Sequence, residues 1–271
     1  MRVPADNNLP DASRASVVAL IDEGNALEEQ GRTAEAMARY DAAVQADPGC
    51  ARAHLNRGNV LLAGGHINEA RSAYQVAIAC DPHYAAAHFN LGNLDCRAGD
   101  YERGLHNYHV AIGIKPDFAS AFVAMGNVLD SLGRTSEAIG SYERALAINP
   151  DDAGVHFNLG LLAIAEGRHE EAANRLRTAT QIRPDYAAAH HALGRVLGTL
   201  GRLEAAEASL QQALSIAPES DEILHDLAMV LMSRNGADVS NINFSRVEFS
   251  NCGAAFFVFL GQQPGRCRSP Y

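Results

Sequence analysis

The sequence repeats itself every 34 residues, and this period constrains the fold more than any other feature. Within the repeat, glycine recurs at two positions, and proline and alanine recur at one position each. The first glycine series is Gly24, Gly58, Gly92, Gly126, Gly160 and Gly194, and the second is Gly31, Gly65, Gly99, Gly133, Gly167 and Gly201. The other series are Pro48, Pro82, Pro116, Pro150, Pro184 and Pro218, and Ala43, Ala77, Ala111, Ala145, Ala179 and Ala213. Four series in one register predict a leader at 1–16, six repeats at 17–220, the first helix of a seventh at 221–236 and a non-repeat tail at 237–271.

Each repeat is expected to form two helices, as the third copy illustrates. Residues 86–98 carry an apolar stripe and are followed by Gly99, which tolerates the left-handed backbone that ends a helix. A second helix is expected from about residue 101 to 114, because Pro116 cannot continue it. One repeat cannot bury its own apolar face, so stacked repeats must share a core. The sequence therefore predicts an all-α array.

These repeats resemble the tetratricopeptide repeat (TPR) family over residues 17–236. The fourth copy carries the family motif as Met125-Gly126, Ala138, Tyr142, Ala145 and Pro150. The departures are Gly104 for the usual alanine, Leu176 and Leu210 for the aromatic residue, and Leu20, His54, His88, Phe122, His156 and His190 for the tryptophan often found in the first helix. The resemblance implies a right-handed solenoid of helix-turn-helix repeats, in which first helices line a concave groove and second helices form the outer wall.

Asparagine is the informative residue at the expected groove positions. A first row, just before the Leu-Gly pair, is Asn56, Asn90 and Asn158; a second row, three residues further on, is Asn25, Asn59, Asn93 and Asn127. Residues three apart share a helix face. Because an amide side chain both donates and accepts, two such rows suit the peptide groups of an extended segment. The alternative, that the amides tie neighbouring helices together, stays open.

Apolar side chains precede the first row at Leu55, Phe89, Val123 and Phe157. These side chains either contact a ligand or pack against the next repeat, and the sequence leaves both interpretations open. The predicted peptide-binding groove consists of Asn25, Asn56, Asn59, Asn90, Asn93, Asn127, Asn158, Phe89 and Phe157. The groove also offers Arg52, Arg57, Arg97 and Arg195, whereas the only lysine, Lys115, ends a second helix. This distribution disfavours the TPR subclass that clamps a C-terminal carboxylate with lysine and arginine.

The first row is similar to the asparagine ladder of the superhelical N-terminal domain of O-linked N-acetylglucosamine transferases, which binds substrate peptides. Ala124 and Ala192 interrupt the row, and Asp22 and Asp226 replace asparagine at its ends. The resemblance implies an alternative function, the substrate-binding part of such a glycosyltransferase. A domain that binds a sugar nucleotide needs alternating strands and helices, and it spans well above ~100 residues. The tail cannot supply one, so the chain is expected to lack transferase activity.

Composition excludes several other classes. The 22 basic and 32 acidic residues give a net charge of −10, which disfavours nucleic acid as a partner. The longest apolar run, 254–260, is far shorter than the roughly 20 residues of a membrane helix, so no membrane is expected as a partner. Five cysteines without a CxxC pair favour neither a disulfide framework nor a zinc site. The cytoplasm is the expected location.

No pattern indicates catalysis. Four of the eleven histidines occupy one repeat position, at His54, His88, His156 and His190. Adjacent helix axes lie about 8–10 Å apart, so these rings cannot converge on one metal ion. The phosphate-binding, hydrolase and dinucleotide motifs are missing. We therefore expect no enzyme, no cofactor and no metal, but a scaffold that binds an extended peptide or a partner helix; self-association stays open.

The tail departs from the repeat in both register and composition. Five of the nine phenylalanines lie between Phe244 and Phe259. Three interpretations stay open: the tail folds back as a cap, it binds a second copy or another partner, or it is a non-native end that follows an altered reading frame near codon 235. Whether the leader is ordered is also left open.

Overall fold

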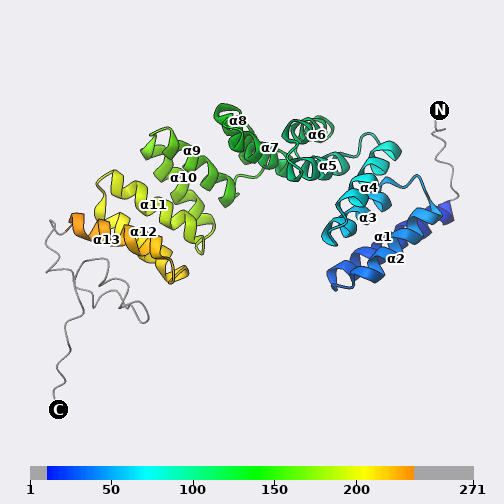
Figure 1. The fold of residues 1–271 in the computed structure, drawn as a ribbon, viewed down its shortest axis with the longest axis horizontal. Helices are drawn as coiled ribbons and strands as arrows, with labels where there is room; N and C mark the ends of the chain where they lie inside the picture. The colour runs from blue at the N-terminus through cyan, green and yellow to red at the C-terminus, as the bar shows by residue number, and fades with distance from the viewer. Residues whose placement is uncertain (1–10, 235–271) are drawn as a thin grey trace, which may run out of the picture. The chain divides into compact units, whose positions relative to one another are not determined.

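The computed structural model describes residues 11–234 as thirteen α-helices joined by short turns (Figure 1). Their bounds are α1 Asp11–Glu29, α2 Thr33–Ala46, α3 Ala51–Ala63, α4 Ile67–Cys80, α5 Ala85–Arg97, α6 Tyr101–Ile114, α7 Ala119–Ser131, α8 Thr135–Ile148, α9 Ala153–Ala165, α10 His169–Ile182, α11 Ala187–Thr199, α12 Leu203–Ile216 and α13 Asp221–Arg234. The predicted all-α fold of helix-turn-helix repeats is confirmed. The interpretations of the tail at 237–271 fall outside the described residues.

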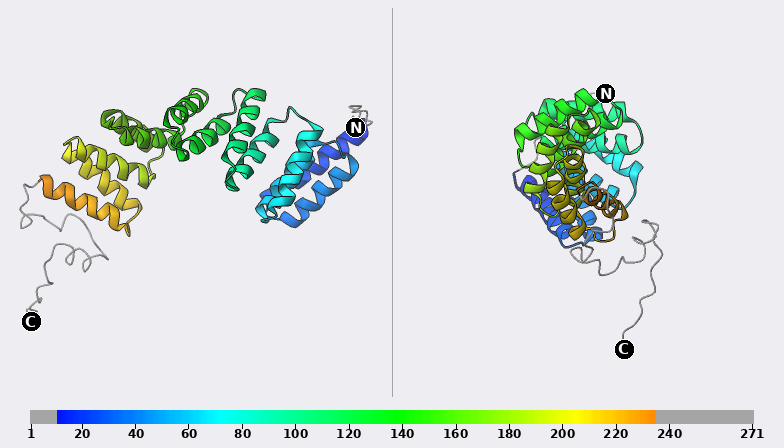
Figure 2. Two further views of the ribbon diagram at one scale, coloured as in Figure 1. Left: turned by 45° about the horizontal axis from the view of Figure 1, so that its top comes forward. Right: turned by 90° about the vertical axis from the view of Figure 1, so that its left-hand side faces the viewer.

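The described helices belong to two compact units, one with α1–α9 and one with α10–α13. In the first unit, α1 pairs with α2, α3 with α4, α5 with α6 and α7 with α8, and each pair packs against the next helix along the chain (Figure 2). In the second unit, α11 pairs with α12, while α10 packs against α11 and α13 against α12. None of the described helices is long and apolar enough to cross a membrane.

The first helix is longer than the repeat period predicts. It begins at Asp11, whereas the 34-residue register placed its start at residue 17 and assigned 1–16 to a leader. The intervening segment, Asp-Ala-Ser-Arg-Ala-Ser, contains neither glycine nor proline, so nothing in it interrupts a helix. The period marks where the repeat begins, but the helix continues upstream of it.

The turn between the paired helices depends on glycine. All six glycines of the second series have positive φ, between 71° for Gly133 and 84° for Gly99. Side chains other than hydrogen are disfavoured in this left-handed region. The turn predicted from the glycine spacing is therefore formed in every copy that the structure describes.

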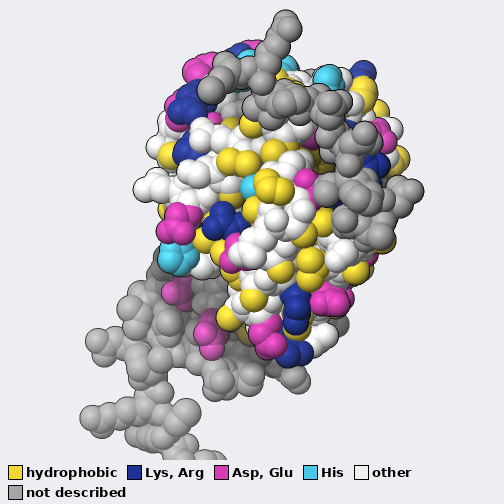
Figure 3. All heavy atoms as spheres, turned by 90° about the vertical axis from the view of Figure 1, so that its right-hand side faces the viewer, with side chains coloured by type: hydrophobic (Ala, Val, Ile, Leu, Met, Phe, Trp, Pro, Cys, Tyr) yellow, Lys and Arg dark blue, Asp and Glu magenta, His cyan; other side chains and the backbone are white. Residues whose placement is uncertain are grey.

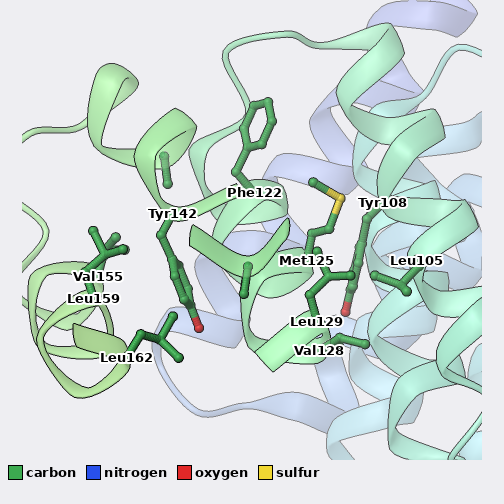
Figure 4. Packing of buried hydrophobic residues seen from close by; sticks show 12 residues of the cluster. Leu105, Tyr108, Phe122, Met125, Val128, Leu129, Tyr142, Val155, Leu159 and Leu162 are labelled. Carbon is green, nitrogen blue, oxygen red and sulfur yellow. The ribbon is translucent and has the colours of Figure 1, made fainter. Parts of the chain in front are cut away.

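The core of each early repeat is a tyrosine packed on a glycine. Tyr74 of α4 is fully buried, and a Cβ atom built on Gly58 of α3 would lie 2.6 Å from its Cε1 atom. A side chain at Gly58 would therefore push the two helices apart. Figure 4 shows the equivalent residues Tyr108 and Tyr142 in the core formed by α6–α9.

The third repeat departs from this apolar core. Asp95 of α5 is fully buried at the position that holds Leu61 and Leu129 in the neighbouring repeats. Its carboxylate pairs with Arg71 of α4, lies 3.7 Å from Arg103 of α6, and accepts a 3.0 Å hydrogen bond from Asn107 of α6. We refer to Asp95, Arg71, Arg103 and Asn107 as the Asp95 cluster. It joins three consecutive helices through one buried charge.

Gly104 lies beside this cluster at a position that holds alanine in every other repeat, at Ala36, Ala70, Ala138, Ala172 and Ala206. A Cβ atom built on Gly104 would overlap the Cys96 sulfur and would lie 3.1 Å from the carbonyl oxygen of Gly92. The sulfur of Cys96 occupies the space that the alanine methyl group fills in the other repeats. Burial raises the pKa of the Cys96 thiol, so it behaves as a packing residue.

We expect Gly104→Ala to destabilise the chain by about 1–3 kcal/mol, because the added methyl group overpacks against Cys96. Alanine is the better helix former by about 1 kcal/mol, so the same change should become neutral or stabilising in a Cys96→Ala background. Urea denaturation of the four proteins of this double-mutant cycle measures the coupling. Additive effects would show that Cys96 does not select glycine.

Candidate functional site

Asparagine side chains connect consecutive first helices in the first unit. The amide nitrogen of Asn56 in α3 donates to the Oδ1 atom of Asn25 in α1 over 2.8 Å. The same bond joins Asn90 of α5 to Asn59 of α3, also at 2.8 Å. Asn158 of α9 repeats it toward Asn127 of α7, at 3.1 Å. Each first-row residue thus bonds a second-row residue of the preceding repeat.

Buried tyrosines hold the second row from behind. The hydroxyl groups of Tyr74, Tyr108 and Tyr142 donate to Asn59, Asn93 and Asn127, over 3.0, 2.7 and 2.8 Å respectively. The hydroxyl group of Tyr40 lies 2.8 Å from the Oδ1 atom of Asn25 and also contacts the carboxylate of Glu28. Burial raises the pKa of Tyr74 and of Tyr142 to about 12, so both hydroxyls keep their proton at neutral pH. The hydroxyl groups therefore fix the orientation of the second-row amides.

This arrangement shows the role that sequence reasoning left as the alternative: the amides tie neighbouring helices together. These ties leave some hydrogen-bonding groups of the amides unused. Within residues 11–234, one N–H and the oxygen of Asn90 form no hydrogen bond, nor do the amide N–H groups of Asn59 and Asn93. In the next repeat the first-row position is Ala124, so no first-row amide of that repeat bonds Asn93.

These unused groups meet at a pocket between the second and third repeats. The pocket has a volume of about 280 Å³. Its lining residues are Asn59, Leu62 and Ala63 of α3, Tyr74 of α4, and Asn90, Asn93 and Arg97 of α5. Three of the nine predicted groove residues thus converge on one concave site.

The groove arginines differ in their ion pairs. Arg52 lies 3.0 Å from Asp22, and Arg57 lies 2.7 Å from Asp41. In the second unit, Arg195 lies 3.5 Å from Asp226. Arg97, at the end of α5, is exposed and forms no ion pair with any other residue in the described part of the chain. The pocket thus carries a cation whose charge is not neutralised by a neighbour.

The predicted apolar contacts are partly used in packing. The ring of Phe89 lies 5.0 Å from Phe118 and 5.8 Å from Tyr108, centroid to centroid, which places it against the second helix of its own repeat and the turn that leads into α7. Leu55 is 6% exposed and belongs to the core. Phe89 and Phe157 are half-buried, so an edge of each remains accessible. For Phe89 the structure shows packing, and a ligand contact stays a prediction.

The recurring histidines have a structural role that sequence reasoning missed. In each case a ring nitrogen contacts the carbonyl oxygen of the proline six residues earlier: His54 with Pro48, His88 with Pro82, His156 with Pro150 and His190 with Pro184, over 2.9–3.2 Å. The histidine closes the turn between repeats, and its constant spacing from proline was the available signal. No cluster of potential metal ligands occurs among the described residues.

Charges of both signs are interspersed on the surface. On the face that Figure 3 shows, arginine and acidic side chains alternate with apolar and neutral ones. Among the described residues, several charges form ion pairs with a residue three positions along the chain, such as Arg32 with Glu35 and Arg134 with Glu137. Paired surface charges contribute little net field. Of the groove arginines Arg52, Arg57, Arg97 and Arg195, Arg97 is the one without an ion pair to a described residue.

The sequence matches the family model of the cilia and flagella-associated protein 70 C-terminal domain over residues 10–250. No curated protein matches the sequence significantly.

Solved TPR structures share the fold. PilF of Pseudomonas aeruginosa is 20% identical, with a TM-score of 0.74, and covers 81% of this chain and 100% of its own. PilW, a type IV pilus biogenesis factor, is 18% identical, with a TM-score of 0.66, over 82% and 100% of the two chains. YrrB, a TPR protein with an unusual peptide-binding site, is 24% identical, with a TM-score of 0.58, over 69% and 96%. At these identities the likeness establishes the fold alone.

Proposed function

The chain belongs to the family of the cilia and flagella-associated protein 70 C-terminal domain, and from this premise we propose that it is a scaffold that binds an extended peptide or a partner helix in its groove. TPR domains are in general protein-interaction modules. The observation that supports the proposal is the pocket between α3 and α5, where amides with unused hydrogen-bonding groups meet. The solved relative YrrB has a peptide-binding site by its own description, which is consistent with this use of the fold.

The chemistry of the groove favours an extended ligand. The amides of the first unit recur from one repeat to the next on the same helix positions. Their remaining donors and acceptors match the N–H and C=O groups of a peptide, largely independent of its side chains. The half-buried Phe89 and Phe157 would add apolar contacts at two points.

Replacing the first row tests this proposal. We expect the triple variant Asn56→Ala, Asn90→Ala, Asn158→Ala to lower peptide affinity by at least about tenfold, because each amide removed leaves peptide groups unpaired. The tyrosine bonds to the second row remain, so the fold is expected to survive. The measurement is fluorescence anisotropy with peptides selected against the full chain from a displayed random library.

Asn68 and Asn174 provide the matched control, because they lie on second helices and the substitution is the same change from asparagine to alanine. Changing both to alanine should leave affinity within about twofold. Circular dichroism melts of all variants separate lost binding from lost structure. Unaltered affinity in a folded triple variant would contradict the proposal.

The alternative function, a substrate-binding part of an O-linked N-acetylglucosamine transferase, rests on the same first row. Detection of sugar transfer by the purified chain would contradict our expectation that it is not an enzyme. The cytoplasmic location also stays a prediction, and the family name points to association with cilia and flagella. Light scattering over a dilution series tests the remaining possibility, that the array self-associates.

A further inference from the structure

The pocket between α3 and α5 presents more unused donors than acceptors: among its lining amides, only the oxygen of Asn90 accepts no hydrogen bond from a described residue. The Oδ1 atom of Asn59 already accepts from Tyr74 and Asn90. The Oδ1 atom of Asn93 accepts from Tyr108. The N–H groups of both amides are therefore the parts that remain, and Arg97 adds a guanidinium group with five further donors. Donors converging with a cation suit an anion.

The charge of Arg97 is specific to this repeat. Its equivalents in the neighbouring repeats are Ala63 and Ser131, which are uncharged. No acidic residue lines the pocket. The other groove arginines, Arg52 and Arg195, are paired with aspartates of the chain. A carboxylate from outside would give Arg97 the partner that the fold supplies to the others.

The first and fourth repeats, which flank the pocket, disfavour a ligand carboxylate at their own equivalent positions. Two acidic residues occupy the position just before the equivalent of Arg97, Glu28 in the first repeat and Asp130 in the fourth. Like charges there would repel a carboxylate over a few ångströms, whereas charges more than about 8 Å away are screened at physiological salt. An acidic ligand residue is therefore restricted to one place along the groove, which would set the register of the bound segment.

From these observations we infer that the pocket binds an internal acidic side chain of an extended partner segment. Arg97 pairs with its carboxylate, the amides of Asn59 and Asn93 donate to its oxygens, and Leu62 and Ala63 contact its methylene groups. This inference rests on the proposed peptide-binding function and adds the chemical class of the partner. An arginine that only complements the C-terminal end of the α5 dipole would have no effect on the choice of peptide.

The experiment compares peptides selected from a displayed twelve-residue library against the wild-type chain and against Arg97→Glu. We expect aspartate or glutamate to be enriched at one position on the wild type, and lysine or arginine at that position on the variant. A selected peptide, synthesised with an amidated C-terminus, should bind about tenfold less tightly after Glu→Gln or after Arg97→Gln, and the two changes together should lose no more than either alone. Raising the salt concentration should weaken the wild-type complex only.

Arg52→Gln is the matched control, because Arg52 is exposed on the neighbouring helix but already paired with Asp22. It should alter affinity by less than about twofold. Bound peptides without acidic enrichment, or unchanged affinity in Arg97→Gln, would overturn this inference and leave the proposed function standing. Binding that requires a free C-terminal carboxylate would also overturn it. Failure to select any peptide would contradict the proposed function and this inference together.

Discussion

Replacing Asp95 with alanine is expected to lower the free energy of unfolding by about 3–5 kcal/mol, because it leaves the partners of a buried carboxylate without their counter-charge. Arg71 is only 22% exposed and pairs directly with Asp95. Asn107, itself buried, would lose the acceptor of its 3.0 Å hydrogen bond. Three helices, α4, α5 and α6, would lose a common contact. Urea denaturation of the full chain, followed by circular dichroism, measures the loss.

Removing both members of the ion pair should cost far less. The equivalents of Asp95 and Arg71 in adjacent repeats are Leu61 and Leu105, so leucine fits both positions of the array. Apolar replacement of a whole buried pair is often neutral or stabilising. We therefore expect Asp95→Leu with Arg71→Leu to lie within about 1–2 kcal/mol of the wild type, or above it.

The matched control is Asp130→Ala in the next repeat, where the aspartate is exposed. It should change stability by no more than about 0.5 kcal/mol. If Asp95→Ala were as mild as this control, the Asp95 cluster would not contribute to stability. If the double leucine variant were as unstable as Asp95→Ala, the loss would come from shape and not from charge.

Much of the fold could be predicted because its determinants are local. Gly99 marks the end of one helix and Pro116 the end of the next, and both act through the backbone of a few residues. The structure accordingly ends α6 at Ile114, as predicted. The start of α1 could not be placed from the period, because repeat register says nothing about how far a helix extends upstream of the repeat.

The contacts of the candidate site depend on stacking and were less accessible to sequence reasoning. The bond from Asn90 to Asn59 joins residues 31 apart, and it forms only when α3 and α5 lie side by side. Sequence reasoning identified these residues and named the tie as an alternative, but it could not find which groups remain unused. The unpaired state of Arg97 likewise depends on where every acidic side chain lies in space.

The Asp95 cluster, by contrast, left a signal that sequence reasoning did not use. Register alignment puts aspartate where the other repeats hold leucine or alanine, and asparagine at 107 where the second repeat holds Ala73. A polar residue at a core position predicts a buried partner. Reading each repeat for departures from the others, and not only for agreement, would have located it.

Replacing Tyr142 with alanine is expected to cost about 3–5 kcal/mol, because it empties a large buried site. Tyr142 is 1% exposed, and it lies among Val155, Leu159 and Leu162 in the core shown in Figure 4. Tyr142→Leu should cost less, since Leu210 occupies the equivalent position in the sixth repeat. Tyr142→Phe should cost only about 1 kcal/mol, the value of the hydroxyl bond to Asn127. Urea denaturation of the three variants gives the order.

A substitution at Gly126 tests whether the effect of Tyr142 on stability comes from helix packing. A Cβ atom built on Gly126 would lie 2.6 Å from Cε1 of Tyr142, so Gly126→Ala alone is expected to destabilise the chain by about 1–3 kcal/mol. In the Tyr142→Ala background the ring is gone, the methyl group enters empty space, and alanine favours the helix, so the same change should stabilise. A reversal of sign between the two backgrounds identifies direct contact as the cause. If Gly126→Ala destabilised equally in both, the glycine would be required by something other than the tyrosine ring, and the paired glycine and tyrosine series would not be coupled through packing.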